Sequence, residues 1–370
     1  MNYPFISGKF VTGNDFCGRK EELSILKTHI NSNGRVCLIG ERRVGKSSLI
    51  HECVRQISEK KILYIDFWTV RNIDDVCKKI LQGIISYEKK QSFLIKIIKQ
   101  FSYLRPTFSF DQNTGQANIG FSSDSPKMTV ASLEELLDLI ESLTKHVVVF
   151  DEFQDVAQIS ENEKVFATMR SKIQSHTKIP YIFAGSIRNK MIDIFTDYKS
   201  PFYKTAICMN IHPIKRGLFV EFIVKRFSKN GKRKVSSEVV NYIFDLCYEI
   251  PGDIQQLCIY TWMESEENSE ISEETVKIAL LNMFSMLKSS YEKIYDSLSN
   301  QQILFIKTLS LCHDGSSNIS KKFLRLSQID LTQSAAKAAN SLIKKKIILK
   351  ENKIYRFSDP FFKEWVKSLN

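Results

Sequence analysis

The chain has 370 residues, of which 43% are hydrophobic and 25% charged, and this composition excludes an intrinsically disordered or fibrous protein. Its formal net charge of +12 is compatible with a polyanionic partner without identifying one. The sequence has no apolar run of about 18 residues and no secretion-signal pattern at its start, so we expect a cytoplasmic protein without a membrane-spanning helix. The eight cysteines form no Cys-x-x-Cys pair, which favours reduced thiols over disulfides or a zinc site.

Short apolar runs alternate with helical patterns over the first 213 residues. The apolar runs predict buried strands at 35–39, 61–67, 146–150 and 179–184. Helical spacing predicts helices at 47–58, 73–104 and 163–175, and a capping box from Ser132 to Glu135 predicts the start of one that ends near Leu143. Residues 105–125 alternate around Asn-Thr-Gly, which is typical of a hairpin. We therefore predict an α/β fold, a parallel sheet with helices on both faces.

The pattern changes after residue 213. Residues 215–290 are predicted to be helical, with a break at Pro251 and Gly252, and two further helices at 301–312 and 333–345 precede a short hairpin over 347–357. Helices followed by a hairpin are typical of a winged helix-turn-helix. We therefore predict three domains: an α/β domain over 1–213 with a hairpin insertion at about 105–125, a helical lid over 214–292, and a winged-helix domain over 293–370.

A phosphate-binding loop follows the first predicted strand. Residues 40–47 read Gly-Glu-Arg-Arg-Val-Gly-Lys-Ser and fit the Walker A pattern G-x-x-x-x-G-K-[ST] at every fixed position. Gly40 and Gly45 let the backbone turn tightly and present its amides to phosphate oxygens, and the following helix adds its positive N-terminal end. We expect Lys46 to contact the β and γ phosphates and the Ser47 hydroxyl to bind Mg²⁺. The expected nucleotide-binding segment also includes Arg43, Val44 and Ser48.

Two acidic residues follow the strand predicted at 146–150. A carboxylate at the carboxyl end of a parallel strand faces the crevice in which α/β sheets bind ligands. We expect Asp151 to hold Mg²⁺, directly or through water, and Glu152 to orient or deprotonate the attacking water, as a Walker B pair would. The alternative is that both acids only cap a helix at 153–158. Ser186 ends the next strand and is expected to sense the γ-phosphate or that water, unless it is a simple turn residue.

These motifs together resemble those of the archaeal-type ATPase family, P-loop proteins grouped with the AAA+ and STAND NTPases. The similar segments are 16–23 (F-x-G-R-x-x-E-L), 40–47 (G-x-R-R-x-G-K-[ST]), the hairpin at 105–115, the acidic strand end at 150–154, the sensor serine segment at 184–186, and 359–365 (D-P-x-F-x-x-W). The resemblance implies that Gly18 and Arg19 lie beside the nucleotide. It also implies that the C-terminal domain is a winged helix.

Two positions depart from the family pattern. The segment Ser-Pro-Phe-Tyr-Lys, which ends at Lys204, stands where the family usually has S-P-L-[YF]-G-R, and we expect Lys204 to replace the arginine that acts on the γ-phosphate. Pro251 is implied on the adenine side, and Gln255 and Gln256 stand where many AAA+ relatives carry a sensor arginine. Hydrolysis is therefore expected to be slow or completed by a partner. Arg188 is an alternative candidate for the phosphate-sensing cation.

The combined motifs predict a Mg²⁺-dependent ATP-binding and ATP-hydrolysing protein of AAA+/STAND type that acts as a nucleotide-driven conformational switch. The alternative is an ATP-regulated DNA-binding regulator in which ATP is mainly structural, because residues 215–234 hold eight basic side chains against one acidic. The predicted wing adds Lys344, Lys345, Lys346, Lys350 and Lys353. A solvated charged face, a protein partner or self-association fits these charges equally well. A small-molecule kinase fits the extra domains less well, and no Asn-Lys-x-Asp motif supports GTP.

Overall fold

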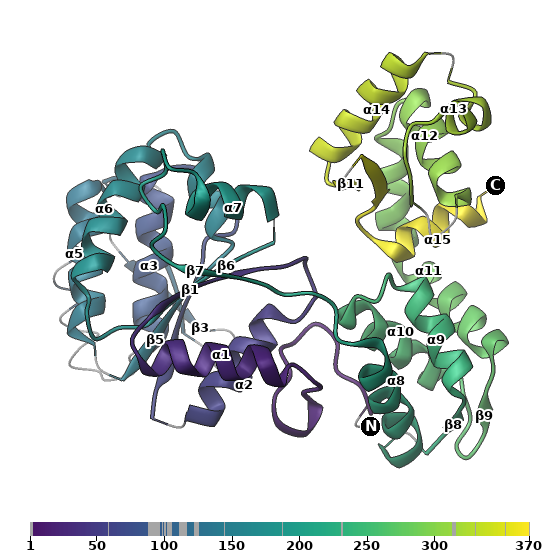
Figure 1. Ribbon diagram of the computed structural model, residues 1–370, viewed down its shortest axis with the longest axis horizontal. Coiled ribbons are helices and arrows are strands. Elements are labelled where there is room, and N and C mark those ends of the chain that lie inside the picture. Colours follow the sequence, from purple (N-terminus) through teal and green to yellow (C-terminus); the bar gives the residue numbers. More distant parts are fainter. Residues whose placement is uncertain are drawn as a thin grey trace. The chain divides into compact units, whose positions relative to one another are not determined.

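The computed structural model describes residues 3–57, 59–87, 97, 99, 101, 106–110, 117–121, 126–143, 145–186, 188–230, 232–312, 316–329, 331–351 and 353–369. The chain divides into two compact units (Figure 1). The first unit is Phe10–His212, and the second combines Met1–Lys9 with Pro213–Asn370. None of the described helices is both long and apolar enough to cross a membrane.

A parallel sheet lies at the centre of the first unit. Among the described residues it has five strands, in the order β2-β5-β6-β1-β7, and all neighbouring pairs are parallel. The strands are β1 (Arg35–Ile39), β2 (Lys61–Asp66), β5 (His146–Asp151), β6 (Tyr181–Gly185) and β7 (Ile207–Asn210). The four predicted strands are confirmed. The sequence analysis missed β7, because this edge strand is mostly exposed and lacks a continuous apolar run.

Helices cover both faces of the sheet, as predicted (Figure 1). In β5, Val147 and Val149 belong to one buried cluster, whereas Val148 and Phe150 belong to the other. Helices α1 (Lys20–Asn31) and α2 (Lys46–Ile57) pack on the first side, and α3 (Ile73–Tyr87), α5 (Val130–Ser142), α6 (Asn162–Ser175) and α7 (Arg188–Thr196) contribute to the second. Strands buried on both faces are apolar throughout, which is why their sequences read as unbroken hydrophobic runs.

Three local expectations differ in detail from the structure. The helix expected over 73–104 is described as α3 up to Tyr87, and most of its remainder lies outside the described residues. The expected hairpin is confirmed as antiparallel β3 (Pro106–Phe110) and β4 (Ala117–Phe121), with its turn outside the described residues. The capping prediction at Ser132 was wrong: Thr129 is the N-cap of α5, and Ser132 Oγ accepts a hydrogen bond from the Thr129 amide at 3.2 Å.

Helices dominate the second unit before residue 298. They are α8 (Arg216–Lys225), continued by a π-helical segment (Arg226–Asn230), α9 (Ser237–Leu246), α10 (Pro251–Met263) and α11 (Glu273–Asp296). The predicted break is confirmed, because Pro251 is the first residue of α10, where its missing amide hydrogen is harmless. A parallel pair, β8 (Lys234–Val235) and β9 (Glu270–Ile271), was not predicted, since two residues carry no periodicity. The N-terminal segment packs here through Phe5, whose ring centroid lies 4.6 Å from that of Phe227.

The end of the chain forms a winged helix. Its helices are α12 (Asn300–Leu311), α13 (Lys321–Ser327), α14 (Thr332–Lys344) and α15 (Pro360–Ser368). The described wing is an antiparallel sheet in the order β10-β12-β11, formed by Ser316–Ser317, Ile354–Phe357 and Ile348–Glu351. The predicted hairpin is confirmed, whereas α13 and β10 were missed because both are short. Asp359 caps α15 by accepting hydrogen bonds from the amides of Phe361 and Phe362.

Candidate active site

The glycine-rich loop joins the carboxyl end of β1 to the N-terminus of α2, the strand-loop-helix context that the pattern requires. Lys46 is the first residue of α2 and is 92% buried. Its ammonium group donates hydrogen bonds to the carbonyl oxygens of Gly40 at 2.7 Å and Glu41 at 3.0 Å. Burial lowers the pKa of Lys46, while the nearby carboxylates of Asp151 and Glu152 act in the opposite direction. The loop lysine therefore lies close to the acidic strand end.

The two pattern glycines are needed for different physical reasons. A Cβ atom at Gly40 would lie 2.6 Å from the carbonyl oxygen of Ile211, so this position lacks room for a side chain. Gly45 has space, since the nearest heavy atoms are guanidinium nitrogens of Arg19 at 3.9 Å. Its φ of +101°, however, is a conformation that other residues rarely adopt. Arg43 is also left-handed, with a φ of 62°.

Arg19 holds the loop against the end of the sheet. It follows Gly18, which has a φ of 68°, and its own backbone is left-handed just before α1. Its buried guanidinium donates hydrogen bonds to the carbonyl oxygens of Val44 at 2.6 Å and His212 at 2.9 Å. The Arg19 side chain thus positions the loop by binding a backbone carbonyl oxygen of the loop. Ser48, another predicted binding residue, accepts a hydrogen bond from the Val11 amide at 3.1 Å.

The two predicted metal ligands meet at one tyrosine hydroxyl. Tyr64 of β2 donates a hydrogen bond to Asp151 Oδ2 at the end of β5, and the Ser47 hydroxyl lies near enough to lower the pKa of the same phenol. Burial, followed by the charge of Asp151, raises the pKa of Tyr64 strongly, so the phenol remains a neutral donor. The sequence analysis missed Tyr64. The only sequence clue was a polar aromatic residue inside an apolar run, two positions before the strand ends.

A further carboxylate lies beside this pair. Asp66 is the register partner of Asp151 in the neighbouring strand, so both acids stand at the same edge of the sheet. Burial raises the pKa of Asp66, and the charge of Asp151 adds to this effect. Its Oδ1 accepts a hydrogen bond from the amide of Trp68 at 2.8 Å. Asp66 was not predicted as a site residue, although its place directly after a predicted strand resembles that of Asp151.

Glu152 is held by side chains from three segments. Ser186 Oγ donates to Glu152 Oε2 at 2.8 Å, Gln154 Nε2 donates to the same oxygen, and Arg42 Nε lies 4.0 Å from Oε1. Arg42 also stacks over the ring of Trp68, with 4.0 Å between its Cζ and the ring centroid. The segment Phe153–Gln158 is a 3-10 helix to which the Glu152 side chain makes no capping hydrogen bond. The structure therefore brings Glu152 and Ser186 together.

Three further candidates were named from the sequence: Lys204, Pro251 and Arg188. Lys204 is exposed, with its ammonium 5.0 Å from the centroid of the Tyr203 ring. Its φ of 53° is the conformation that glycine favours, and counting along S-P-L-[YF]-G-R puts Lys204 at the glycine and Thr205 at the arginine. Our alignment of Lys204 with the arginine was therefore one residue out of register. Pro251 belongs to the second unit, and the side chain of Arg188 lies outside the described set.

A glycine-rich loop between β1 and α2, beside carboxylates at the ends of neighbouring parallel strands, defines a P-loop NTPase. The family model described as an ATPase domain predominantly from Archaea matches residues 16–257, and the chain belongs to this family. A second model, described as a probable winged helix domain, matches residues 289–368. The protein is thus a nucleotide-binding ATPase with a C-terminal winged helix.

Solved structures with the same fold include two archaeal proteins. The Walker-type ATPase Paby2304 of Pyrococcus abyssi has a TM-score of 0.63 at 17% identity, over 98% of this chain and 99% of that one. The ORC1 protein of Aeropyrum pernix, solved in complex with DNA, has a TM-score of 0.53 at 11% identity, over 97% of this chain and 94% of that one. At these identities the likeness is one of fold. No curated protein sequence matches the chain significantly.

Proposed function

We propose that the chain is a Mg²⁺-dependent ATP hydrolase that acts as a nucleotide-driven conformational switch and turns over slowly on its own. The observation that carries the proposal is the meeting of Ser47 and Asp151 at the Tyr64 hydroxyl, beside the buried Lys46. Residues from the loop and from two separate strands thereby surround the point where a polyphosphate on the loop amides would end.

The donor set fits magnesium. Ser47 offers a hydroxyl and Asp151 a carboxylate, and such hard oxygen ligands suit Mg²⁺ when water and phosphate oxygens complete the octahedron. When bound, the ion would neutralise charge on the β and γ phosphates. Tyr64 orients the Asp151 carboxylate through its hydrogen bond. Lys46 would exchange its two loop carbonyls for phosphate oxygens, which gives its ammonium a stronger partner.

Glu152 is the proposed general base. The hydrogen bonds that Ser186 and Gln154 donate hold the Glu152 carboxylate in one orientation, as a general base that must face the attacking water requires. Ser186 is therefore proposed to couple the base to the γ-phosphate. Neither Lys204 nor Arg188 is assigned as the phosphate-sensing cation, and completion of the site by a partner would accelerate the reaction.

The switch would use the division predicted from the sequence, 1–213, 214–292 and 293–370. We propose Pro251 as the adenine-side contact supplied by the lid. Exchange of ATP for ADP would then change the orientation of the winged-helix domain. The boundary at 292 falls inside the continuous helix α11, which would link the lid to the winged helix mechanically because a helix transmits rotation along its length.

The test compares the wild-type chain with Lys46→Ala, Glu152→Gln and a control, Glu161→Gln, which alters an exposed acid at the start of α6. Glu152→Gln is expected to retain ATP binding and to lose hydrolysis by about 10²–10⁴-fold, the usual contribution of a general base. Lys46→Ala should lose both, and Glu161→Gln neither. Hydrolysis that persists in Lys46→Ala, or that continues without Mg²⁺, would contradict the proposal.

The DNA-binding alternative has one specific observation in its favour, the exposed lysines at the end of α14 and in the wing. Lys344 and Lys353 are exposed, whereas several basic residues of 215–234 have protein partners. Arg216, for example, pairs with Asp245 at 2.7 Å and Glu249 at 2.9 Å. Duplex DNA binding should therefore weaken steeply with salt and weaken further in Lys344→Glu. Binding that does not change with salt concentration would contradict this alternative, and the winged helix would then be assigned to binding a protein partner or a second copy of the chain.

A further inference from the structure

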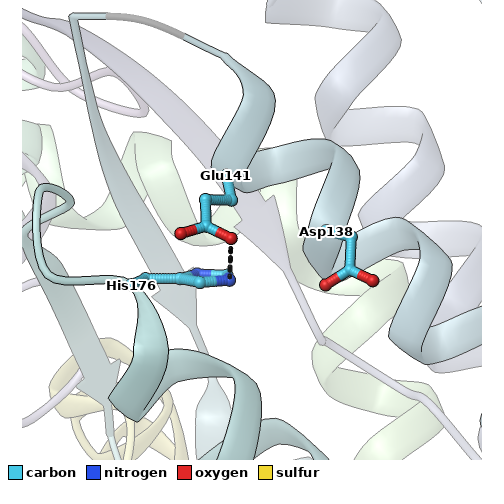
Figure 2. Close-up of side chains that lie close together, drawn as sticks. All are labelled: Asp138, Glu141 and His176. Carbon is cyan, nitrogen blue, oxygen red and sulfur yellow. Dashed lines mark ion pairs between the residues drawn. The ribbon is translucent and has the colours of Figure 1, made fainter.

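Three metal-ligating side chains meet on the first unit, away from the loop and the acidic strand ends (Figure 2). Asp138 and Glu141 are three residues apart on α5 and therefore lie on the same side of the helix. His176 is the residue at which α6 ends. One ligand atom from each residue lies within 4.8 Å of the other two. Bonds of about 2.0–2.2 Å to one ion would need only small movements of the two exposed acids.

His176 provides the observation that points to a ligand. Its side chain is completely buried, and Nδ1 lies 2.6 Å from the Tyr181 hydroxyl. Nε2 has no hydrogen-bond partner in the described part of the chain, and it faces Glu141 Oε2 at 3.7 Å, which is too long for a hydrogen bond (Figure 2). A buried ring nitrogen without a partner is costly, and a bound cation would satisfy it.

The surroundings of His176 prepare it for coordination. A neutral imidazole is the form that binds metals, and its two ring nitrogens then have different roles. If Nδ1 donates its hydrogen to the Tyr181 oxygen, the lone pair of Nε2 is directed toward Glu141. Metal-binding histidines are usually held in this way: one ring nitrogen binds the metal, and the other donates a hydrogen bond to a neighbouring group. Tyr181 would thus be a positioning residue for the ring.

Lys172 occupies one of the proposed ligands, Asp138, and a bound metal ion would have to displace it. Its ammonium lies 2.6 and 2.8 Å from the two carboxylate oxygens of Asp138. The lysine is a flexible, partly exposed side chain that can move into solvent, whereas the two acids and the imidazole remain. A divalent cation therefore competes with Lys172 for Asp138, and removal of the lysine should strengthen binding of the ion.

We propose that Asp138, Glu141 and His176 bind one divalent transition-metal ion of the Zn²⁺ type. One imidazole nitrogen with two carboxylates suits Zn²⁺, while Mg²⁺ and Ca²⁺ favour oxygen-only sites. Three protein ligands leave a position for water. The ion would tie the last turn of α5 to the end of α6, and its site is distinct from the proposed magnesium site.

The test titrates the nucleotide-free full chain with Zn²⁺ against a chromophoric chelator, in excess Mg²⁺ and a phosphine reductant. Wild type should bind one equivalent at this site. Glu141→Gln and Asp138→Asn should each weaken binding at least tenfold, and Lys172→Met should strengthen it several-fold. Glu163→Gln, an exposed acid at the opposite end of α6, is the matched control and should change nothing. These four positions are at the surface, so the variants test the proposal even if a change at buried His176 impairs folding.

Cobalt distinguishes this site from the cysteines. The Co²⁺ form should show absorption of a nitrogen and oxygen ligand set, and the chain should gain thermal stability from Zn²⁺ that Glu141→Gln does not gain. A sulfur-to-cobalt charge-transfer band would assign the ion to thiolates such as exposed Cys208 and overturn the proposal. Unchanged affinity in both Glu141→Gln and Asp138→Asn would also overturn it, as would unchanged affinity in Lys172→Met.

Discussion

Replacing Gly40 by alanine tests whether the loop depends on close packing against the end of the sheet. The added Cβ would lie 2.6 Å from the Ile211 carbonyl oxygen and 3.1 Å from both Ile211 Cβ and Val44 Cγ1. Contacts between heavy atoms are comfortable at roughly 3.5 Å. The obstacle is backbone, and the Ile211 amide is itself bound to the Ile39 carbonyl at 2.7 Å. The loop is therefore expected to shift away from Ile211, whose backbone is held by this hydrogen bond.

The expected magnitude follows from this overlap. Forcing an extra methyl group into a packed site costs about 1–3 kcal/mol. Amide hydrogen bonds to a ligand depend on distances held within a few tenths of an ångström, so the displaced loop should bind phosphate less well. If about 1.4–2.8 kcal/mol of that cost appears in binding, ATP affinity falls about 10–100-fold. Thermal stability of the first unit should fall as well.

The assay combines thermal unfolding with equilibrium binding of a fluorescent ATP analogue. Gly217→Ala is the matched control, because no heavy atom of the described chain lies within 4 Å of the added methyl group. This position is in the first turn of α8, where alanine should stabilise by about 0.4–1 kcal/mol without changing ATP affinity. Gly40→Ala protein with wild-type affinity and unfolding temperature would refute the packing argument.

Three further changes probe individual groups. Tyr64→Phe removes the hydrogen bond to the Asp151 carboxylate, and a hydrogen bond to a charged group contributes about 1.5–3 kcal/mol. The nucleotide-free variant should therefore unfold at a lower temperature than wild type. An unchanged unfolding temperature would show that this hydrogen bond does not stabilise the protein. The Arg55 guanidinium, together with backbone and amide donors, lowers the pKa of Glu52 from 4.5 to about 2. The resulting stabilisation is present above pH 4.5 and is lost as pH falls toward 2, and Glu52→Gln should remove this part of an acid-unfolding curve. A Glu52→Gln curve identical to wild type would contradict that assignment. A hydrogen bond from Cys37 lowers the pKa of exposed Cys208 to about 7, while burial raises that of Cys37. Iodoacetamide at pH 8 should therefore modify Cys208 first, as peptide mass spectrometry would report, and faster modification of Cys37 would show that the thiols are arranged differently.

Local sequence patterns were sufficient to predict a feature when one short segment contains both its secondary structure and its functional side chains. The loop at 40–47 was recognised because its glycines, lysine and serine are contiguous and follow an apolar run. Asp151 and Glu152 were proposed as site residues for a similar reason, because they directly follow an apolar run. The errors were also local: Thr129 and Ser132 are both good capping residues, so the sequence alone did not distinguish the N-cap from the third helical position.

Contacts between distant segments were decided by the tertiary structure. Tyr64 and Asp151 are 87 residues apart, and they meet only because β2 and β5 are neighbours in register. Arg19 reaches His212 across 193 residues. Backbone geometry fixes how residues close in sequence are placed relative to one another, so a local sequence pattern can predict their arrangement. Partners across the sheet depend on strand order, and many strand orders are compatible with the same apolar runs. The contact of Tyr64 with a proposed metal ligand therefore became visible only in the folded chain.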